Sequence, residues 1–317
     1  MPRFHSLALS AALVCALAGG TAHAVQRTHV SAAFGADANT ASGCTAAAPC
    51  RFFQAAMTVT DPNGEVVVLD SGGYGAVTIT QSVSLIAPTG VYAGISVFPG
   101  ANGVTIATPG VDVTLRGITI NSQGGNNGIN MTAGARLTVE NCVITNFNSS
   151  YGINVVTAAT VGVRDTALRN NYVGIYLNAG ATATIARTTV GSAGSGYGIY
   201  VFNAAAGTTT SAAVTESTVS GGFSGIDGIS GYSNPATANV RVSVIHSTVT
   251  KNAYGIEAQS FAGSPSVVTV SETMVTNNAS VGLYQSGAGA VLESLGNNTV
   301  RQNTFNTGGT ITTVAPM

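Results

Sequence analysis

The chain contains very little charge. Asp, Glu, Lys and Arg make up 7% of its 317 residues, against about 25% in an average globular protein, and tryptophan is absent. The formal net charge is −1, so the chain has no electrostatic attraction for nucleic acid or for an anionic membrane surface. Intrinsic disorder is disfavoured, because 45% of the residues are hydrophobic and they recur in register along the chain.

Long apolar runs are absent as well. A membrane-spanning helix needs about 20 apolar residues, and the apolar run near the start, Leu7 to Leu17, is too short. Arg3 and His5 precede this run and Ala22-His23-Ala24 follows it, which is typical of a secretory signal with its cleavage site. Residues 1–24 are therefore predicted to be a signal peptide that is removed from a secreted or periplasmic protein.

Cysteine is scarce, and three residues remain after the predicted signal. Cys44 and Cys50 lie six residues apart in a loop rich in Gly, Ala and Pro, and in an oxidising compartment this spacing predicts a disulfide. A metal site would need further ligands, and His29 is the only candidate nearby. Cys142 has no basic neighbour that would lower its pKa, so a buried structural thiol is favoured over a catalytic one.

Glycine is abundant, and in the second half of the chain its positions are periodic. Gly-hydrophobic pairs recur there every 22 to 30 residues, which indicates a solenoid, at Gly128-Ile129, Gly152-Ile153, Gly174-Ile175, Gly198-Ile199, Gly228-Ile229, Gly255-Ile256 and Gly282-Leu283. A second segment recurs between the pairs, as in VENCVITN (139–146) and VTESTVSG (214–221). Each repeat therefore holds at least two short strands joined by Gly, Asn and Ser turns.

The region before the repeats has a different pattern. Residues 25–63 are predicted to form a loop and a short helix over Arg51–Val59, with Phe52, Phe53, Ala56 and Met57 on its apolar side. A stack of coils has an open hydrophobic end, and this helix is expected to cap it. Residues 64–317 are predicted to form the stack itself.

Aligning the repeats produces columns of equivalent residues. One column is apolar and is expected to stack inward: Ile120, Ile144, Leu168, Val190, Val219, Val249, Val275 and Val300. A column of mostly small residues two positions earlier is expected to share hydrogen bonds inside the stack: Ile118, Cys142, Thr166, Thr188, Ser217, Ser247, Thr273 and Asn298. Asparagines after the strands are expected at left-handed turns: Asn146, Asn170, Asn252, Asn277 and Asn303.

The repeated unit, Gly-Ile-x-x followed by Val-x-x-Ser/Thr-x-Val-x-Asn, resembles the right-handed parallel β-helix of the pectin-lyase-like superfamily. The segment VVVLDSGGYGAVTITQSVSLI (66–86) is also similar to the first coils of secreted bacterial β-helix proteins. The resemblance covers about residues 64–314. It implies an all-β, single-stranded right-handed parallel β-helix of about ten coils, but it does not imply an activity, because the superfamily contains lyases, hydrolases, epimerases and adhesins.

Residues for the chemistry of these enzymes are not evident in the sequence. The lyases of the superfamily combine a Ca²⁺-binding carboxylate cluster with an Arg or Lys base, and the hydrolases use close Asp pairs. The six Asp residues of this chain lie in different segments, and Lys251, the only lysine, lies at a turn where we expect it to be solvated. An enzyme is therefore disfavoured and no cofactor is expected. The alternative is a polysaccharide lyase or epimerase acting on acidic polysaccharide, for which Ca²⁺ would be a cofactor.

Charge gathers in one column, one residue before the small-residue column: Asn141, Asp165, Arg187, Glu216, His246, Glu272 and Asn297. We interpret it as an outward ladder in which opposite charges alternate up the stack. The alternative is an acid/base or metal set of Glu216, His246 and Glu272, and such a metal site would need further ligands nearby.

A second outward column follows the Gly-Ile pairs: Asn130, Asn154, Tyr176, Tyr200, Ser230, Glu257 and Tyr284. Aromatic rings stack on sugar faces, and amides and carboxylates bind hydroxyls. We therefore predict a secreted, non-catalytic protein that presents this sheet face to a polysaccharide, a cell-surface glycan or another partner. The alternative is that tyrosine is simply a favourable exposed strand residue.

Overall fold

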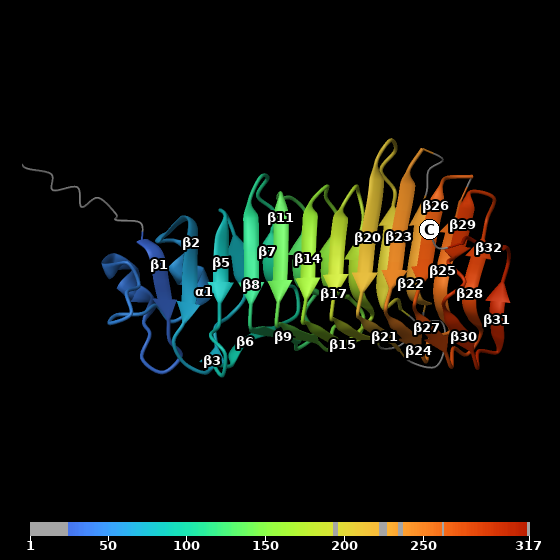
Figure 1. The fold of residues 1–317 in the computed structure, drawn as a ribbon. Helices are drawn as coiled ribbons and strands as arrows, with labels where there is room; N and C mark the ends of the chain where they lie inside the picture. The colour runs from blue at the N-terminus through green and yellow to red at the C-terminus, as the bar shows by residue number, and fades with distance from the viewer. Residues whose placement is uncertain (1–24, 193–195, 222–226, 234–236, 262, 316–317) are drawn as a thin grey trace, which may run out of the picture.

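The computed structural model describes residues 25–192, 196–221, 227–233, 237–261 and 263–315; the predicted signal peptide lies outside these ranges. The described chain winds into three parallel sheets that run the length of the molecule (Figure 1). From β2 onward, consecutive strands enter different sheets, and each strand pairs with its equivalent one repeat later. The predicted parallel β-helix is confirmed.

Within the described residues, sheet A, at the front in Figure 1, has twelve strands: β1 (Val25–Val30), β2 (Thr60–Val68), β5 (Val83–Ile86), β8 (Asp112–Arg116), β11 (Arg136–Glu140), β14 (Thr160–Arg164), β17 (Thr182–Ala186), β20 (Thr209–Thr215), β23 (Asn239–Ile245), β26 (Ser266–Ser271), β29 (Ala290–Ser294) and β32 (Ile311–Thr313).

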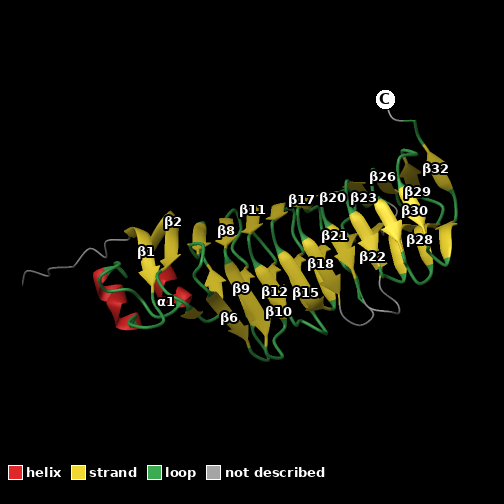
Figure 2. Ribbon diagram, turned by 60° about the horizontal axis from the view of Figure 1, so that its bottom comes forward, coloured by secondary structure: helices red, strands yellow, loops and turns green. Residues whose placement is uncertain are grey.

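Sheet B, which comes forward in Figure 2, has ten strands in the same part of the chain: β3 (Gly72–Gly73), β6 (Ala93–Val97), β9 (Ile118–Ser122), β12 (Val143–Thr145), β15 (Ala167–Asn171), β18 (Thr189–Ser192), β21 (Thr218–Ser220), β24 (Thr248–Thr250), β27 (Met274–Thr276) and β30 (Thr299–Arg301).

Sheet C also has ten strands within these ranges: β4 (Val77–Ile79), β7 (Asn102–Ile106), β10 (Asn127–Met131), β13 (Tyr151–Val155), β16 (Val173–Leu177), β19 (Ile199–Asn203), β22 (Asp227–Ser233), β25 (Tyr254–Ser260), β28 (Val281–Ser286) and β31 (Phe305–Gly308).

The apolar column stacks inward on sheet B as predicted. Val219 pairs in register with Val190 on one side and Val249 on the other, and Val249 pairs with Val275. These side chains are fully buried. Val300, in the last strand of the sheet, is only partly buried. The interior is therefore a continuous column of aliphatic side chains, which removes apolar surface from water along the whole stack.

The small-residue column is a buried hydrogen-bonded ladder at the corner between sheets A and B. The Ser217 hydroxyl donates to the Thr215 carbonyl at 2.7 Å and accepts the Thr188 amide at 3.1 Å. Ser247 repeats this pattern, donating to the Ile245 carbonyl at 2.8 Å and accepting the Ser217 amide at 3.2 Å. The column requires small polar residues because each one satisfies backbone groups of its own turn and of the preceding coil.

Cys142 occupies one rung of this ladder. Its side chain is 2% exposed, and its thiol donates to the Glu140 carbonyl at 3.3 Å. Burial raises the pKa of this thiol to about 11. A protonated, inaccessible thiol is a poor nucleophile, so the structural interpretation of Cys142 is supported.

The turns between sheets B and C differ from the prediction by one residue at two of the five positions. Asn146, Asn170 and Asn277 have left-handed backbones as expected, but Lys251 takes this conformation in place of Asn252. Asn252 lies one residue further on and is buried; its amide nitrogen donates to Asn278 Oδ1 at 3.2 Å. Gln302 likewise has the left-handed backbone expected of Asn303, which accepts from Asn278 Nδ2 at 2.8 Å. The buried asparagines form a second ladder, for which an amide is needed and lysine is unsuitable.

A short helix packs at the N-terminal end of the stack, as predicted. Helix α1 (Phe53–Met57) is shorter than expected and buries Phe53, Ala56 and Met57, while Phe52 is 40% exposed. A 3₁₀ helix, η1 (Asp37–Ser42), precedes it. Residues 25–30 were expected in a loop, but they form β1, which pairs with β2 and extends sheet A. Neither helix in the described ranges is long and apolar enough to cross a membrane.

The predicted disulfide between Cys44 and Cys50 is present, and both residues are fully buried. It lies beside strand β1, because the His29 amide donates to the Cys44 carbonyl at 2.7 Å and the Cys50 amide donates to the His29 carbonyl at 2.9 Å. The bridge therefore holds the N-terminal loop against the edge of sheet A.

Asp70 also ties the N-terminal region to the first coil. Its carboxylate accepts hydrogen bonds from the Ser31 hydroxyl at 2.5 Å, the Ala32 amide at 2.7 Å and the Tyr74 hydroxyl at 2.5 Å. Burial alone would raise the pKa of Asp70, but the hydrogen bonds from Ser31, Tyr74 and the Ala32 and Ala33 amides outweigh it and lower the pKa to about 2. The folded state thus stabilises the ionised carboxylate.

Asp70→Asn is expected to lower the free energy of unfolding at pH 7 by about 2 kcal/mol, because it removes hydrogen bonds to a charged group. A lowered pKa stabilises the fold above the unfolded pKa of about 3.9 and loses this contribution as pH falls toward 2. Denaturant unfolding at pH 7 and pH 2.5 should therefore show a smaller acid-induced loss in Asp70→Asn than in the wild type. Asp112→Asn, at an exposed position on β8, is the control, and an equal effect of the two substitutions would contradict the role of Asp70.

Candidate functional site

The residues predicted to bind sugar lie in one continuous column on sheet C. The column takes one residue from each of the nine strands from β4 to β28, in register: Thr78, Thr105, Asn130, Asn154, Tyr176, Tyr200, Ser230, Glu257 and Tyr284. The Ser230 side chain lies outside the described part. The neighbours of Asn154 along its strand, Ile153 and Val155, are fully buried, so strand alternation puts the column on the outer face. We call it the sheet C column.

Five aromatic rings meet around the middle of this column. Tyr176 lies 5.1 Å from Tyr151 and 5.4 Å from Tyr200, measured between ring centroids. Tyr197 stacks on Tyr200 at 4.1 Å, and Phe202 lies 5.9 Å from Tyr200 and 6.4 Å from Tyr176. We call these five residues the aromatic cluster. Its rings come from the neighbouring coils of β13, β16 and β19 and form one apolar surface along the axis.

Burial raises the pKa of Tyr176 to about 12, and the neighbouring Tyr151 adds to the effect. The Tyr176 hydroxyl accepts a hydrogen bond from Asn178 Nδ2 at 3.1 Å. Tyr176 is therefore neutral at physiological pH, half-buried and held in place by its neighbours. Such a pre-positioned ring binds a ligand with little loss of side-chain entropy.

The sequence analysis missed four of the aromatic residues named on this face: Tyr151, Tyr197, Phe202 and Tyr254. Tyr151, Tyr197 and Tyr254 directly precede the Gly of a Gly-Ile pair, and the ring centroids of Tyr254 and Tyr284 are 5.0 Å apart. The glycine is required by close approach, since a Cβ at Gly152 would lie 2.7 Å from the Gly174 carbonyl oxygen. A Tyr-Gly-Ile pattern was thus the available signal: it marks coils in which a ring precedes the glycine.

Polar side chains flank the aromatic cluster on both sides. Asn154 is 9% exposed, and its Nδ2 donates to Asn130 Oδ1 at 2.7 Å. Its Oδ1 atom is buried and has no hydrogen-bond partner. At the other end of the column Glu257 is 5% exposed, beside Tyr284 on the next strand. Along one line, the aromatic surface is therefore bordered by a largely buried amide on one side and a largely buried carboxylate on the other.

The charged column lies at the turn between sheets A and B, not on a strand. Its residues from Asn141 to Glu272 all have left-handed backbones, with φ between 46° and 51°. Arg187 donates two hydrogen bonds to Asp165, at 2.8 and 2.9 Å, and lies 4.0 Å from Glu216. The hydrogen bonds from Arg187 and its positive charge lower the pKa of Asp165.

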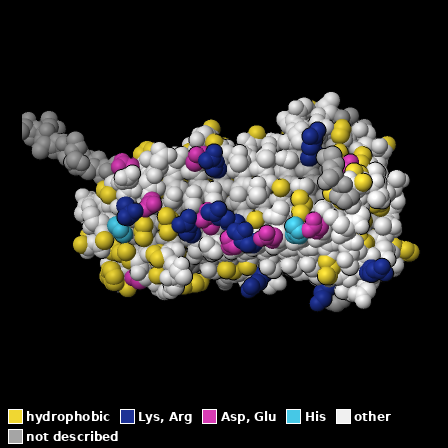
Figure 3. All heavy atoms as spheres, viewed as in Figure 1, with side chains coloured by type: hydrophobic (Ala, Val, Ile, Leu, Met, Phe, Trp, Pro, Cys, Tyr) yellow, Lys and Arg dark blue, Asp and Glu magenta, His cyan; other side chains and the backbone are white. Residues whose placement is uncertain are grey.

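The charged side chains follow one another along the lower edge of sheet A in Figure 3. His246 pairs with Glu272 in the next coil. Among the described residues, no three His, Cys, Asp or Glu side chains are grouped so that they could hold a metal ion. The contacts support the interpretation of this column as an ion ladder.

A second set of ion pairs, which the sequence analysis missed, lies beside the charged column. Glu140 is buried and pairs with both Arg116 and Arg164.

Sheet A carries a groove on its outer face. It has a volume of about 600 Å³ and crosses strands β17, β20, β23 and β26. Its outward lining is formed mainly by Thr184, Ser211, Ala213 and Ser243, and Arg241 is the one ionisable side chain in it. The lining offers hydroxyl groups for hydrogen bonds, but it does not bring an acid and a base together.

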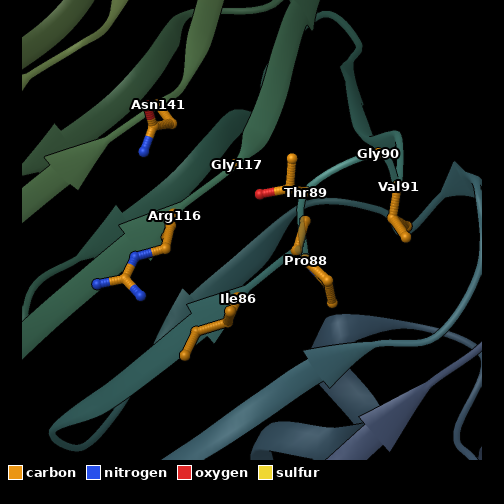
Figure 4. A pocket seen from close by; sticks show the side chains of 9 residues that line it. Ile86, Pro88, Thr89, Gly90, Val91, Arg116, Gly117 and Asn141 are labelled. Carbon is orange, nitrogen blue, oxygen red and sulfur yellow. The ribbon is translucent and has the colours of Figure 1, made fainter.

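A smaller hollow of about 470 Å³ lies between the loop over residues 87–91 and Asn141, the first residue of the charged column (Figure 4). Figure 4 shows Ile86 and Arg116 on neighbouring strands and Thr89 on the loop. Arg116 is the one ionisable residue that lines it, and its guanidinium already pairs with Glu140 at 2.9 Å. This hollow therefore has weaker binding features than the sheet C column.

Residues 102–260 match the model of the right-handed β-helix region family. The match covers half of the chain, so the chain belongs to this family, and the handedness implied by the sequence resemblance is confirmed. No curated protein matches the chain.

Two solved structures are similar in fold. The first is the GH136 lacto-N-biosidase from Eubacterium ramulus, with a TM-score of 0.60 and 11% identity over 87% of this chain. This chain spans 59% of the length of that enzyme. The second is pectate lyase Pel9A, with a TM-score of 0.51 and 12% identity over 90% of this chain and 78% of the lyase. At these identities the similarity shows the fold alone.

Proposed function

We propose that the protein is a secreted, non-catalytic β-helix protein that binds a glycan along the sheet C column. The observation that carries the proposal is the aromatic cluster, in which five rings from neighbouring coils lie 4.1 to 6.4 Å from a neighbour. Sugar rings present apolar faces that stack on aromatic side chains. An unbranched sugar chain lying along the axis would reach Asn154 and Glu257 at either side of the cluster.

The geometry favours an extended ligand that lies along the column over one that inserts into a pocket. The sheet C column runs along the axis of the stack, and coils are about 4.8 Å apart, close to the length of one sugar unit. Each rung therefore contributes one weak contact. A secreted or periplasmic location is supported by the predicted signal peptide and is compatible with the buried disulfide.

Affinity is expected to rise with the length of the oligosaccharide. A ligand of two sugars covers about two rungs, whereas one of six covers the whole aromatic cluster and both polar flanks. We expect the affinity for a hexasaccharide to exceed that for the disaccharide of the same series by at least tenfold. A glycan array followed by calorimetry with a length series tests this. An array without hits, or affinity that is independent of length, would contradict the proposal.

The alternative is a polysaccharide lyase or epimerase, and the observation that favours it is the hydroxyl-lined groove on sheet A with Arg241 at its side. An enzyme of this kind would release a 4,5-unsaturated product from pectate or alginate. Incubation of the protein with these polymers, with and without Ca²⁺, and measurement of near-ultraviolet absorbance distinguish the two. Product formation that is lost in Arg241→Ala would favour the enzyme.

A further inference from the structure

We infer that the ligand of the sheet C face is an uncharged glycan, and that acidic polysaccharides are excluded from it. This inference rests on the proposed function, because it names the class of glycan that the same face would accept. Two observations support it: the ten strands of sheet C contain acidic but no basic residues, and the Oδ1 atom of Asn154 is an acceptor without a hydrogen-bond partner.

The strands of sheet C contain two acidic residues and no basic one. Asp227 and Glu257 are the acids, and none of the ten strands includes Lys, Arg or His. The nearest cations in sequence lie before sheet C strands: Arg169 and Arg301 lie on β15 and β30 of sheet B, and Lys251 lies at the exposed turn that follows β24. Glu257 itself is buried within the face.

A uronate residue stacked on the aromatic cluster would have to bring its carboxylate against this surface. Removing a carboxylate from water without a cation or several donors is strongly unfavourable, and the acidic side chain of Glu257 supplies no compensating positive charge. Proteins that recognise carboxylates use Arg or Lys for this reason. The face supplies neither, so the cost of desolvating a uronate is not offset.

The hydrogen-bonding groups of the face point to the same class. Asn154 Oδ1 is buried without a partner, one strand away from Tyr176. An unpaired buried acceptor is unfavourable, and a ligand that donates to it would relieve that cost. Sugar hydroxyls and the N–H of an acetamido group are such donors, whereas an ionised carboxylate is an acceptor only.

Binding of three hexasaccharides tests the inference: cellohexaose, chitohexaose and hexagalacturonate, measured by calorimetry at 50 mM salt. We expect at least one of the two uncharged probes to bind, and hexagalacturonate to bind at least tenfold more weakly. Hexagalacturonate binding equal to or tighter than that of the uncharged probes, and lost when Tyr176 and Tyr200 are both replaced by Ala, would overturn the inference and leave the proposed function standing. Absence of binding by all three would contradict the proposed function itself.

Two variants and a matched control test the inference further. Thr105→Arg places a cation on the sheet C column, and it should raise the affinity for hexagalacturonate at least fivefold at 50 mM salt and less at 500 mM. Thr119→Arg, at a partly buried outward position on β9 of sheet B, is the matched control and should have no effect. Asn154→Leu should weaken binding of the uncharged probe at least fivefold without lowering the melting temperature. An unchanged affinity in Asn154→Leu would show that the Asn154 acceptor does not contribute to binding, and a gain in Thr119→Arg equal to that in Thr105→Arg would overturn the role of the face.

Discussion

Replacing Val249 with Asp is expected to prevent the chain from folding to a soluble protein. Val249 is fully buried between Val219 and Val275 in the interior column. An unpaired carboxylate at this position costs several kcal/mol, against a total stability of about 5–15 kcal/mol. The column also offers no polar partner in the same layer, because its members on sheet B are aliphatic.

Thr250→Asp is the matched control, because Thr250 is the next residue on the same strand and is only partly buried. Strand alternation turns its side chain outward, so this variant should fold and lose little stability. The measurement is the soluble yield and thermal unfolding of both variants, expressed in parallel. If Val249→Asp folds as well as Thr250→Asp, the register of β24 is wrong.

The register of the interior was predictable because two independent periodicities agree. Alternation along a strand has a period of two, and the repeat places Ile120, Ile144 and Leu168 in equivalent positions. A shift by one residue would turn every one of these side chains outward. The hydroxyl ladder was predictable for the same reason, since Thr188 and Ser217 occupy equivalent buried positions.

The turns were harder to predict because the conformations of single residues depend on their neighbours in the next coil. Glu216 and His246 have left-handed backbones, with φ of 50° and 48°, a conformation that is uncommon for residues other than glycine. The buried hydroxyls of Ser217 and Ser247 and the pairing of adjacent coils hold the turn in this shape. The sequence indicated a charged column correctly, but its residue types suggested an exposed strand and not a turn.

The candidate site was predicted only in part. Equivalent positions in the repeats identified Tyr176, Tyr200 and Tyr284, but Tyr151 and Tyr197 lie on the other side of the glycine, where alternation alone predicts an inward side chain. The unpaired Oδ1 of Asn154 depends on the three-dimensional packing of its neighbours and has no signal in the sequence.

Replacing both Tyr176 and Tyr200 with Ala is expected to weaken glycan binding by at least about 2 kcal/mol, roughly 30-fold. Tyr176 and Tyr200 are register partners on β16 and β19, and each contacts Phe202 as well. Their removal opens the centre of the aromatic cluster, so a sugar chain would lose contact with two adjacent rungs at once. Both side chains are partly exposed on the outer face, so the interior column is not disturbed and the variant should fold.

Calorimetry with the hexasaccharide that binds best, together with thermal unfolding, measures this prediction. The double variant Tyr176→Phe and Tyr200→Phe keeps both rings and should retain affinity to within about threefold, because stacking and not the hydroxyl carries the contact. Tyr92→Ala and Phe98→Ala remove aromatic residues that are 54% and 62% exposed elsewhere on the molecule, and neither should change binding. Equal loss in these controls would show that binding is nonspecific, whereas full affinity in the double alanine variant would exclude the aromatic cluster as the binding surface and favour a structural or protein-binding role for sheet C.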